Sequence, residues 1–186
     1  MDSVSFQDYT ATAAQGDYII ITHNKLNRDT AGTNYVEEYR QYRDKVANPG
    51  VGKYDARVFD IDQIYEQFGY GIRKSPLAIR NFVSYAIDKW TAKKPEHLFI
   101  IGKGREYHRM RAASTTAQAY PQCLVPPFGF PGSDNLLTAT RDNPNPRLAV
   151  GRLAAQNAAQ VRDYLEKVKT YELQQNTFGG NLQNKP

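Results

Sequence analysis

Short apolar runs alternate with longer segments of helical period along this chain, and that alternation restricts its fold more than any other feature. The runs Asp17 to Thr22 and His97 to Gly102 are almost continuously apolar, which is typical of strands covered on both faces. Segments of roughly 10 to 18 residues with helical spacing separate the strand-like runs. The pattern predicts an α/β fold with a mainly parallel sheet and helices on both of its faces.

The clearest amphipathic segment covers residues 76–90, where apolar side chains recur at helical spacing. Ser75 and Pro76 are typical of a helix start. Asp60 and Asn157 are suited to begin two further helices as N-caps. Additional strands are expected at 56–59, 122–125 and 148–150, and additional helices at 35–46, 61–68 and within 103–120.

With 186 residues the chain fits one domain, and a chain of this length buries roughly 70% of its unfolded surface without needing a metal or a disulfide. The polar residues 1–16 are expected to form a leader, residues 17–173 the α/β domain, and residues 174–186 a flexible tail. No internal repeat or low-complexity tract divides the chain further.

Charge and hydropathy exclude several classes of function. The formal net charge of +5 is too small to make an electrostatic case for nucleic-acid binding. No apolar run approaches the ~20 residues of a membrane-spanning helix, and the start of the chain lacks the basic and apolar segments of a secretory signal. We therefore expect neither nucleic acid nor a membrane span among the interactions of the chain.

Function in a parallel α/β sheet gathers beyond the carboxyl ends of the strands. Residues 22–24, 102–106 and 151–152 are expected at that edge. Ser133 and Asp134 are also close in sequence to a strand end. A functional site is therefore expected where these segments meet.

The chain has one cysteine, Cys123, and three histidines, His23, His97 and His108, that could act as its base. Cys123 lies in an apolar run before two prolines, where a cysteine is usually a small buried hydrophobic residue. We therefore expect no catalytic role for it. These residues also lack the spacing of a zinc site, so no metal centre is expected.

The segment Gly102-Lys103-Gly104, after a strong strand, suggests an α/β anion- or nucleotide-binding domain as an alternative. The full spacing of a phosphate-binding loop is missing, and Tyr107 stands where a dinucleotide motif needs glycine. The stretch Lys103 to Arg111 is strongly basic. A solvated surface is the ordinary explanation of such a run, and an anion-binding patch is the other.

Two acids, Glu106 and Asp134, stand in loops near strand ends. A carboxylate in such a place can hold a cationic side chain by a bidentate, charge-assisted contact. A turn-forming or capping role is the commoner explanation for Asp134, because Asn135 follows it. On local sequence alone, the structural role ranks first.

Three stretches together resemble the gingipain-type cysteine peptidases and their relatives among surface and secretion-system proteins. The first runs from Gln63 to Gly71 and on into 76–82, and it is similar to a helix–loop–helix unit of the family. The second, His97 to Gly102, is similar to the strand that follows that unit. The third comprises 133–134, 148–153 and 167–172, so that the resemblance extends over residues 17–173.

The resemblance implies a caspase-like α/β fold and a parent protein that is a cysteine endopeptidase. In that family a Cys thiolate attacks the peptide carbonyl and a His moves the proton, and both lie downstream of the segment that ends here in Tyr171-Glu172. The resemblance thus implies that this chain is an amino-terminal subdomain that is inactive by itself. Its partners would be the rest of the peptidase domain and a polypeptide substrate, in a parent that is secreted or on the cell surface, with a link to type IX secretion.

For individual residues, the resemblance implies that Glu106 helps to orient the catalytic His and that Asp134 lines the specificity pocket. It leaves calcium as an implied ion without assignable ligands. The family commonly has Gly-Asp where this chain has Gly102-Lys103. That reversal of charge favours a second hypothesis, a non-catalytic binding or scaffolding module of the same fold.

Overall fold

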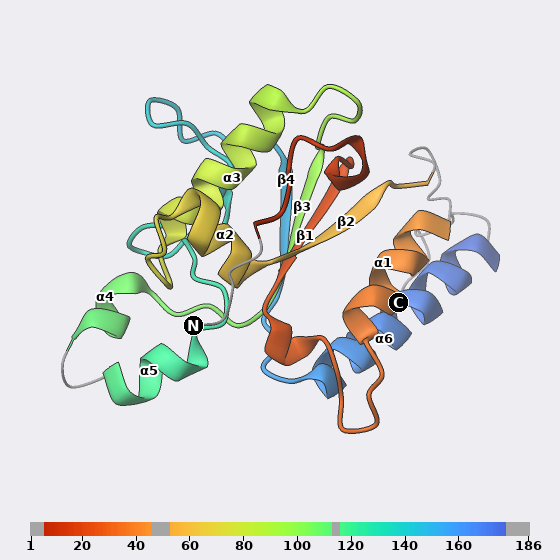
Figure 1. Ribbon diagram of the computed structural model, residues 1–186. Helices are drawn as coiled ribbons and strands as arrows, with labels where there is room; N and C mark the ends of the chain where they lie inside the picture. Colours follow the sequence, from red (N-terminus) through yellow and green to blue (C-terminus); the bar gives the residue numbers. More distant parts are fainter. Residues whose placement is uncertain (1–5, 46–52, 113–115, 178–186) are drawn as a thin grey trace, which may run out of the picture.

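The structure, a computed structural model, describes residues 6–45, 53–112 and 116–177. Its centre is a sheet of four parallel strands in the order β2-β1-β3-β4 (Figure 1). The strands are β1 (Tyr18–Thr22), β2 (Ala56–Asp60), β3 (His97–Ile101) and β4 (Ala149–Leu153). Because all four run in the same direction, their carboxyl ends share one edge of the sheet.

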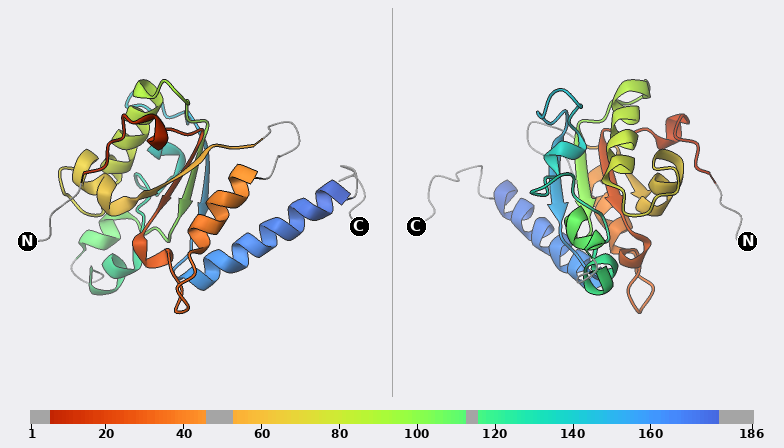
Figure 2. Two further views of the ribbon diagram at one scale, coloured as in Figure 1. Left: turned by 45° about the vertical axis from the view of Figure 1, so that its right-hand side comes forward. Right: turned by 90° about the vertical axis from the view of Figure 1, so that its left-hand side faces the viewer.

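Helices cover both faces of this sheet (Figures 1 and 2). On one face lie α1 (Tyr35–Lys45) and α6 (Ala158–Thr177), and on the other lie α2 (Ile61–Phe68) and α3 (Pro76–Lys89). A parallel sheet between two helical layers confirms the predicted α/β class. Within the described residues, no helix has both the length and the apolar character needed to cross a membrane.

Capping residues account for where several helices begin. The Asp60 carboxylate accepts a hydrogen bond of 2.7 Å from an amide in the first turn of α2. Asn157 caps α6 in the same way, at 3.0 Å, so both predicted N-caps are confirmed. Ser75 makes no side-chain capping bond, and α3 begins with Pro76, whose fixed φ suits the first helical position.

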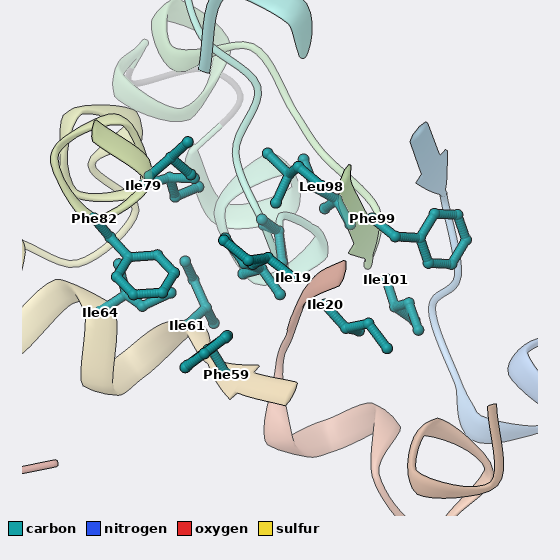
Figure 3. Close-up of a cluster of buried hydrophobic side chains, with 14 of the residues drawn as sticks. Ile19, Ile20, Phe59, Ile61, Ile64, Ile79, Phe82, Leu98, Phe99 and Ile101 are labelled. Atoms are coloured by element: carbon teal, nitrogen blue, oxygen red, sulfur yellow. The ribbon is translucent and has the colours of Figure 1, made fainter. Parts of the chain in front are cut away.

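The core around the sheet is built mainly from aromatic and branched side chains (Figure 3). β1 has a strand on each side, and its Ile19, Ile20 and Ile21 have no exposed surface. Phe82 of α3 is also fully buried, and its ring centroid lies 4.9 Å from that of Phe59 on β2. The continuous apolar run at β1 is thus explained by burial on both faces.

A polar contact attaches α6 to α1 on the other face. Arg43 Nη1 donates to Glu172 Oε1 at 2.7 Å, and the Tyr42 hydroxyl donates to Oε2 of the same carboxylate at 2.7 Å. Arg43 is buried, and its Nε donates to the Tyr39 hydroxyl at 3.0 Å. The two helices are therefore joined by charge as well as by packing.

Residues 6–16, part of the expected leader, run against the domain. Tyr9 is 4% exposed, and its carbonyl accepts a hydrogen bond of 3.0 Å from the indole of Trp90. The side-chain oxygen of Gln15 accepts bonds from the two backbone amides that follow Trp90. Gln15, a polar side chain of this segment, thus caps the backbone that follows α3.

At the other end of the chain, α6 continues to Thr177, past residue 173 where the domain was expected to end. The rest of the expected flexible tail, residues 178–186, lies outside the described residues.

One expected strand is wrong. Residues 122–125 form no strand, because Gln122 ends α5 (Thr116–Gln122) and the amides of Leu124 and Val125 both donate to the Lys103 carbonyl, at 2.8 and 3.3 Å. In a strand, consecutive amides point to opposite sides, whereas the consecutive amides of Leu124 and Val125 donate to the same carbonyl. The helices expected within 103–120 are α4 (Tyr107–Arg111) and α5.

Replacing Phe82 by alanine tests the contribution of the aromatic core. We expect the free energy of unfolding to fall by about 3–5 kcal/mol, because a cavity is left among Tyr9, Phe59, Phe68 and Trp90. Leu77→Ala on the same helix is the matched control, since that side chain is 54% exposed and its loss should change stability by about 0.5 kcal/mol or less. Urea denaturation followed by circular dichroism measures both, and equal effects would contradict this packing.

Candidate functional site at the carboxyl edge of the sheet

Arg152 of β4 joins three segments at the carboxyl edge of the sheet. Its Nε and Nη2 donate to the two carboxylate oxygens of Asp134, each at 2.7 Å. Its Nη1 donates to the Gly102 carbonyl at 2.6 Å and to the Val125 carbonyl at 2.9 Å. One guanidinium thus fixes the turn after β3, the segment after α5 and the loop that carries Asp134. Residues 102–106 and 126–134 are called the rim loops below.

The pair of Arg152 and Asp134 is largely shielded from water, with side chains 13% and 24% exposed. The pairing engages both oxygens of the carboxylate, so a substrate cation would have to compete with Arg152 for them. The predicted role of Asp134 in a specificity pocket therefore stays a prediction. Residues 151–152 were expected near this edge, but nothing in the local sequence indicated the acidic partner of Arg152, which is 18 residues away.

Glu106 holds the tip of the second rim loop. Its Oε1 accepts a bond of 3.3 Å from the Gly132 amide, and its Oε2 accepts one of 3.2 Å from Arg109 Nε. The Phe130 ring near this tip is 75% exposed and meets the His108 ring edge-on, with 4.6 Å between centroids. Glu106 is thus a partly exposed acid at the rim, and its supporting role in catalysis stays a prediction.

His23 follows β1 at the same edge and is 8% exposed. Its Nδ1 accepts a hydrogen bond of 3.1 Å from the Lys25 amide, so the neutral ring carries its proton on Nε2, which lies 3.9 Å from Asp62 Oδ2. Burial lowers the pKa of His23, the Asp62 carboxylate opposes that shift, and Lys74 reinforces it. The ring is therefore held in its neutral form.

Cys123 is fully buried, as its apolar neighbours predicted. Its thiol lies 3.9 Å from the Arg105 carbonyl oxygen, and burial raises the pKa of the thiol. No hydrogen bond within the described part of the chain joins this thiol to a histidine. Lys74 donates to the Cys123 carbonyl, so the backbone here is held from outside the segment as well.

The two glycines of the Gly102-Lys103-Gly104 turn are explained by close packing. Gly102 has φ +151°, and a Cβ on it would lie 3.0 Å from the Val125 side chain. A Cβ on Gly104 would lie 2.9 Å from the Pro127 ring. The turn is therefore filled by the segment after α5, which accounts for both glycines without a bound phosphate.

Part of the basic stretch 103–111 is used within the domain. Arg105 donates to the Gln122 side chain, and Arg109 pairs with Glu106 at 3.2 Å. His97, at the start of β3, stacks on the Tyr18 ring at 5.5 Å and lies far from this edge along the strand.

No metal site is evident among the residues that the structure describes. In these ranges, no three His, Cys, Asp or Glu side chains lie close enough together to hold an ion. The calcium ion that the resemblance implies therefore has no set of three such ligands among these residues, and no step of peptide hydrolysis is assigned to it.

The fold and its edge define an α/β domain with ordered loops at the carboxyl ends of its strands and a buried thiol below them. The profile of Peptidase family C25 matches residues 11–185, and the chain belongs to this family, that of the gingipains. The resemblance inferred from three stretches of sequence is thereby confirmed. No curated protein matches the chain in sequence.

Among solved structures, the chain is similar to dimeric latent PorU from Porphyromonas gingivalis, with a TM-score of 0.63 and 20% sequence identity. The similarity covers 84% of this chain and 15% of that one, so the chain spans a small part of its relative. At this identity the likeness supports the fold alone, and it agrees with the α/β architecture described above.

Removing the guanidinium of Arg152 tests whether it organises the rim loops. We expect Arg152→Ala to lower the free energy of unfolding by roughly 2–3 kcal/mol, because three shielded acceptor groups lose their donor. Asp134→Asn should cost about 1 kcal/mol, since the amide keeps one acceptor oxygen for Arg152. The control is Arg162→Ala, whose pair with Asp163 is exposed to solvent, so its loss should leave stability nearly unchanged. Chemical denaturation measures all three, and an Arg152 effect as small as the control would refute the role.

Stability should depend on the protonation of His23. The pKa of His23 is lowered in the folded state, so the unfolded chain binds a proton on this imidazole more readily. The contribution of neutral His23 to folding stability is therefore present above about pH 6.5, the ordinary pKa of histidine, and is lost as the pH falls below that value. His23→Asn, which keeps an acceptor for the Lys25 amide, should flatten the loss of stability between neutral and mildly acidic pH. His108→Asn removes an exposed imidazole and serves as the control. Identical slopes for the wild type and His23→Asn would contradict the assignment.

Proposed function

We propose that this chain is the amino-terminal subdomain of a gingipain-like cysteine endopeptidase, inactive by itself because the nucleophile and its base belong to other residues of the peptidase. Membership of the peptidase family combined with burial of the chain's only cysteine carries the proposal. In this arrangement the chain supplies a folded support and the rim loops, and the rest of the peptidase domain supplies the Cys and the His.

The environment of Cys123 opposes nucleophilic chemistry. A thiol attacks as the thiolate, which needs a lowered pKa, a nearby base and access to the substrate. Burial shifts the pKa of Cys123 in the other direction and removes the access. The one hydrogen-bond contact of the thiol is with the Arg105 carbonyl oxygen, so Cys123 is placed as a small buried side chain.

The rim loops are the part of the chain that we propose to face the active site. Glu106 is partly exposed there and is proposed as the acid that supports the catalytic His. Asp134 is proposed to border the specificity pocket, where Arg152 sets the position of its carboxylate. A cationic side chain of the substrate would approach an Asp134 carboxylate whose negative charge is already balanced by Arg152.

The partners and location follow from the same proposal. The partner is the remainder of the peptidase domain, and the substrate is a polypeptide. The parent protein is proposed to be secreted or attached to the cell surface, with a link to type IX secretion. The family match and the similarity to PorU support this proposal.

A second candidate, a non-catalytic binding or scaffolding module of the same fold, is favoured by two observations. Lys103 stands where the family commonly has an acid, and the carboxylate of Asp134 is engaged by Arg152. Both remove negative charge from the edge at which a peptidase of this family would bind a cationic side chain.

A peptidase assay of polypeptide 1–186 tests the first proposal. With a reducing thiol and peptides containing Arg or Lys, we expect the same rate as for the Cys123→Ser variant. Alkylation of Cys123 in the native protein should be roughly 100-fold slower than in denaturant, because the thiol is exposed only on opening of the fold. Sustained cleavage that depends on Cys123 would overturn the proposal.

The same assay on a polypeptide that also carries a complete family domain separates the two candidates. Thiol-dependent cleavage there supports the endopeptidase and excludes the scaffolding module. Complete inactivity of a folded protein supports the scaffolding module instead. A thermal shift with millimolar nucleotide would revive the nucleotide-binding alternative, since a ligand that binds only the folded state must stabilise it.

A further inference from the structure

Among the residues that the structure describes, β4 ends the sheet on one side, and some of its backbone groups have no partner there. Its ladder with β3 uses the inward-facing groups of Ala149, Gly151 and Leu153. The N–H and C=O groups of Val150 and Arg152 consequently point away from the sheet. Within the described part of the chain, no residue bonds to these four groups and no further strand follows β4 (Figure 2).

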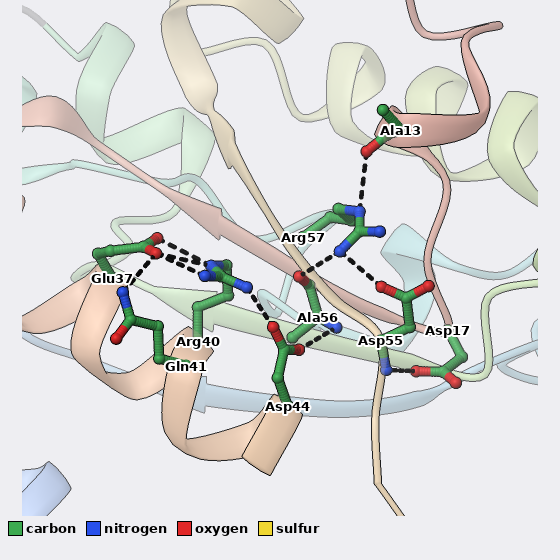
Figure 4. Close-up of polar contacts among 9 residues, drawn as sticks. All are labelled: Ala13, Asp17, Glu37, Arg40, Gln41, Asp44, Asp55, Ala56 and Arg57. Atoms are coloured by element: carbon green, nitrogen blue, oxygen red, sulfur yellow. Dashed lines mark hydrogen bonds and ion pairs between the residues drawn. The ribbon is translucent and has the colours of Figure 1, made fainter.

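The opposite edge of the sheet, formed by β2, is protected by side chains (Figure 4). The outward amide of Ala56 donates to Asp44 Oδ1 at 2.8 Å, and the carbonyl of Ala56 accepts from Arg57 Nη1 at 3.2 Å. Charged side chains that occupy an edge in this way prevent pairing with another strand. β4 lacks such protection, because Arg152, its one charged residue, turns toward Asp134.

The hand of the crossovers bears on what can cover this open edge. The chain passes from β1 to β2 through α1 on one face, and from β2 to β3 through α2 and α3 on the other face (Figure 1). The crossover through α1 leads toward the β2 side of the sheet, and the crossover through α2 and α3 leads back toward the β4 side over the opposite face. Two crossovers that differ in both direction and face have the same hand. Since α6 lies on the face of α1, a crossover of this hand leads from β4 back toward β3 and away from the open edge.

We infer that β4 pairs with β4 of a second copy of this chain, antiparallel, about a two-fold axis at Gly151. In this register Val150 faces the second copy's Arg152 on both sides of the axis. Every outward N–H and C=O group of the edge then has a partner. No charge faces its own copy, because Arg152 lies opposite a valine and keeps its bonds to Asp134.

The flanking residues agree with this register. Ala149, which is exposed, comes opposite Leu153 of the second copy, so an apolar pair closes each end of the junction. The edge has five residues, and the interface is small. We therefore place it in the class of weak, concentration-dependent dimers. This inference goes beyond the proposed function and does not depend on peptidase activity.

Sedimentation equilibrium of polypeptide 1–186 over a wide concentration range tests the dimer. The apparent mass should rise with concentration from 21.1 kDa toward twice that value. Val150→Pro removes an outward N–H without removing a bond to β3, and it should weaken association by roughly 10-fold or more. Hydrogen exchange at the Val150 and Arg152 amides of the wild type should slow as the protein concentration rises.

Val58→Pro is the matched control, because Val58 is the corresponding outward-facing valine in the middle of β2. It should leave association unchanged. Circular dichroism and the thermal midpoint establish that both variants fold, and the exchange measurement on the wild type decides the matter if either does not. A monomer at every concentration, or a dimer that Val150→Pro leaves intact, would overturn the inference.

Discussion

A single guanidinium joins three segments at the carboxyl edge of this domain. Arg152 donates to a carboxylate and to two backbone carbonyls that belong to three separate segments. Those segments contain little regular secondary structure, so they have few backbone bonds of their own to hold them in place. By its place on β4, this one side chain contacts both the Asp134 carboxylate and the glycine turn after β3.

Periodic features of the sequence predicted the layers of the fold well. The apolar run at β1 and the amphipathic stripe of α3 reflect burial that repeats along the element, so a few residues suffice to recognise them. Asp60 and Asn157 were predicted as N-caps because capping is a contact between residues close in sequence. The resemblance to the gingipain family rested on the same short-range patterns, and the family match confirmed it.

Contacts between distant segments were harder to predict. The run at 122–125 is apolar enough for a strand, but it packs against the turn after β3 because Leu124 and Val125 fill the space left by Gly102. The pairing of Asp134 with Arg152 decides whether that acid is available to a substrate, and local sequence carries no signal for it. Tyr9 was missed for a similar reason, since its partners lie on β2 and α3.

The contact between Arg43 and Glu172 has a consequence for how the domain is made, because 129 residues separate its partners. At a synthesis rate of about 5–20 residues per second, roughly 6–26 s pass between the emergence of α1 and that of the last turns of α6. Collapse of a chain this size takes microseconds, so the nascent polypeptide becomes compact long before this helix exists. Once β3 has emerged and until α6 follows, Phe99 lacks the Tyr164 ring that it stacks on in the complete domain, so its side chain is more accessible to chaperones.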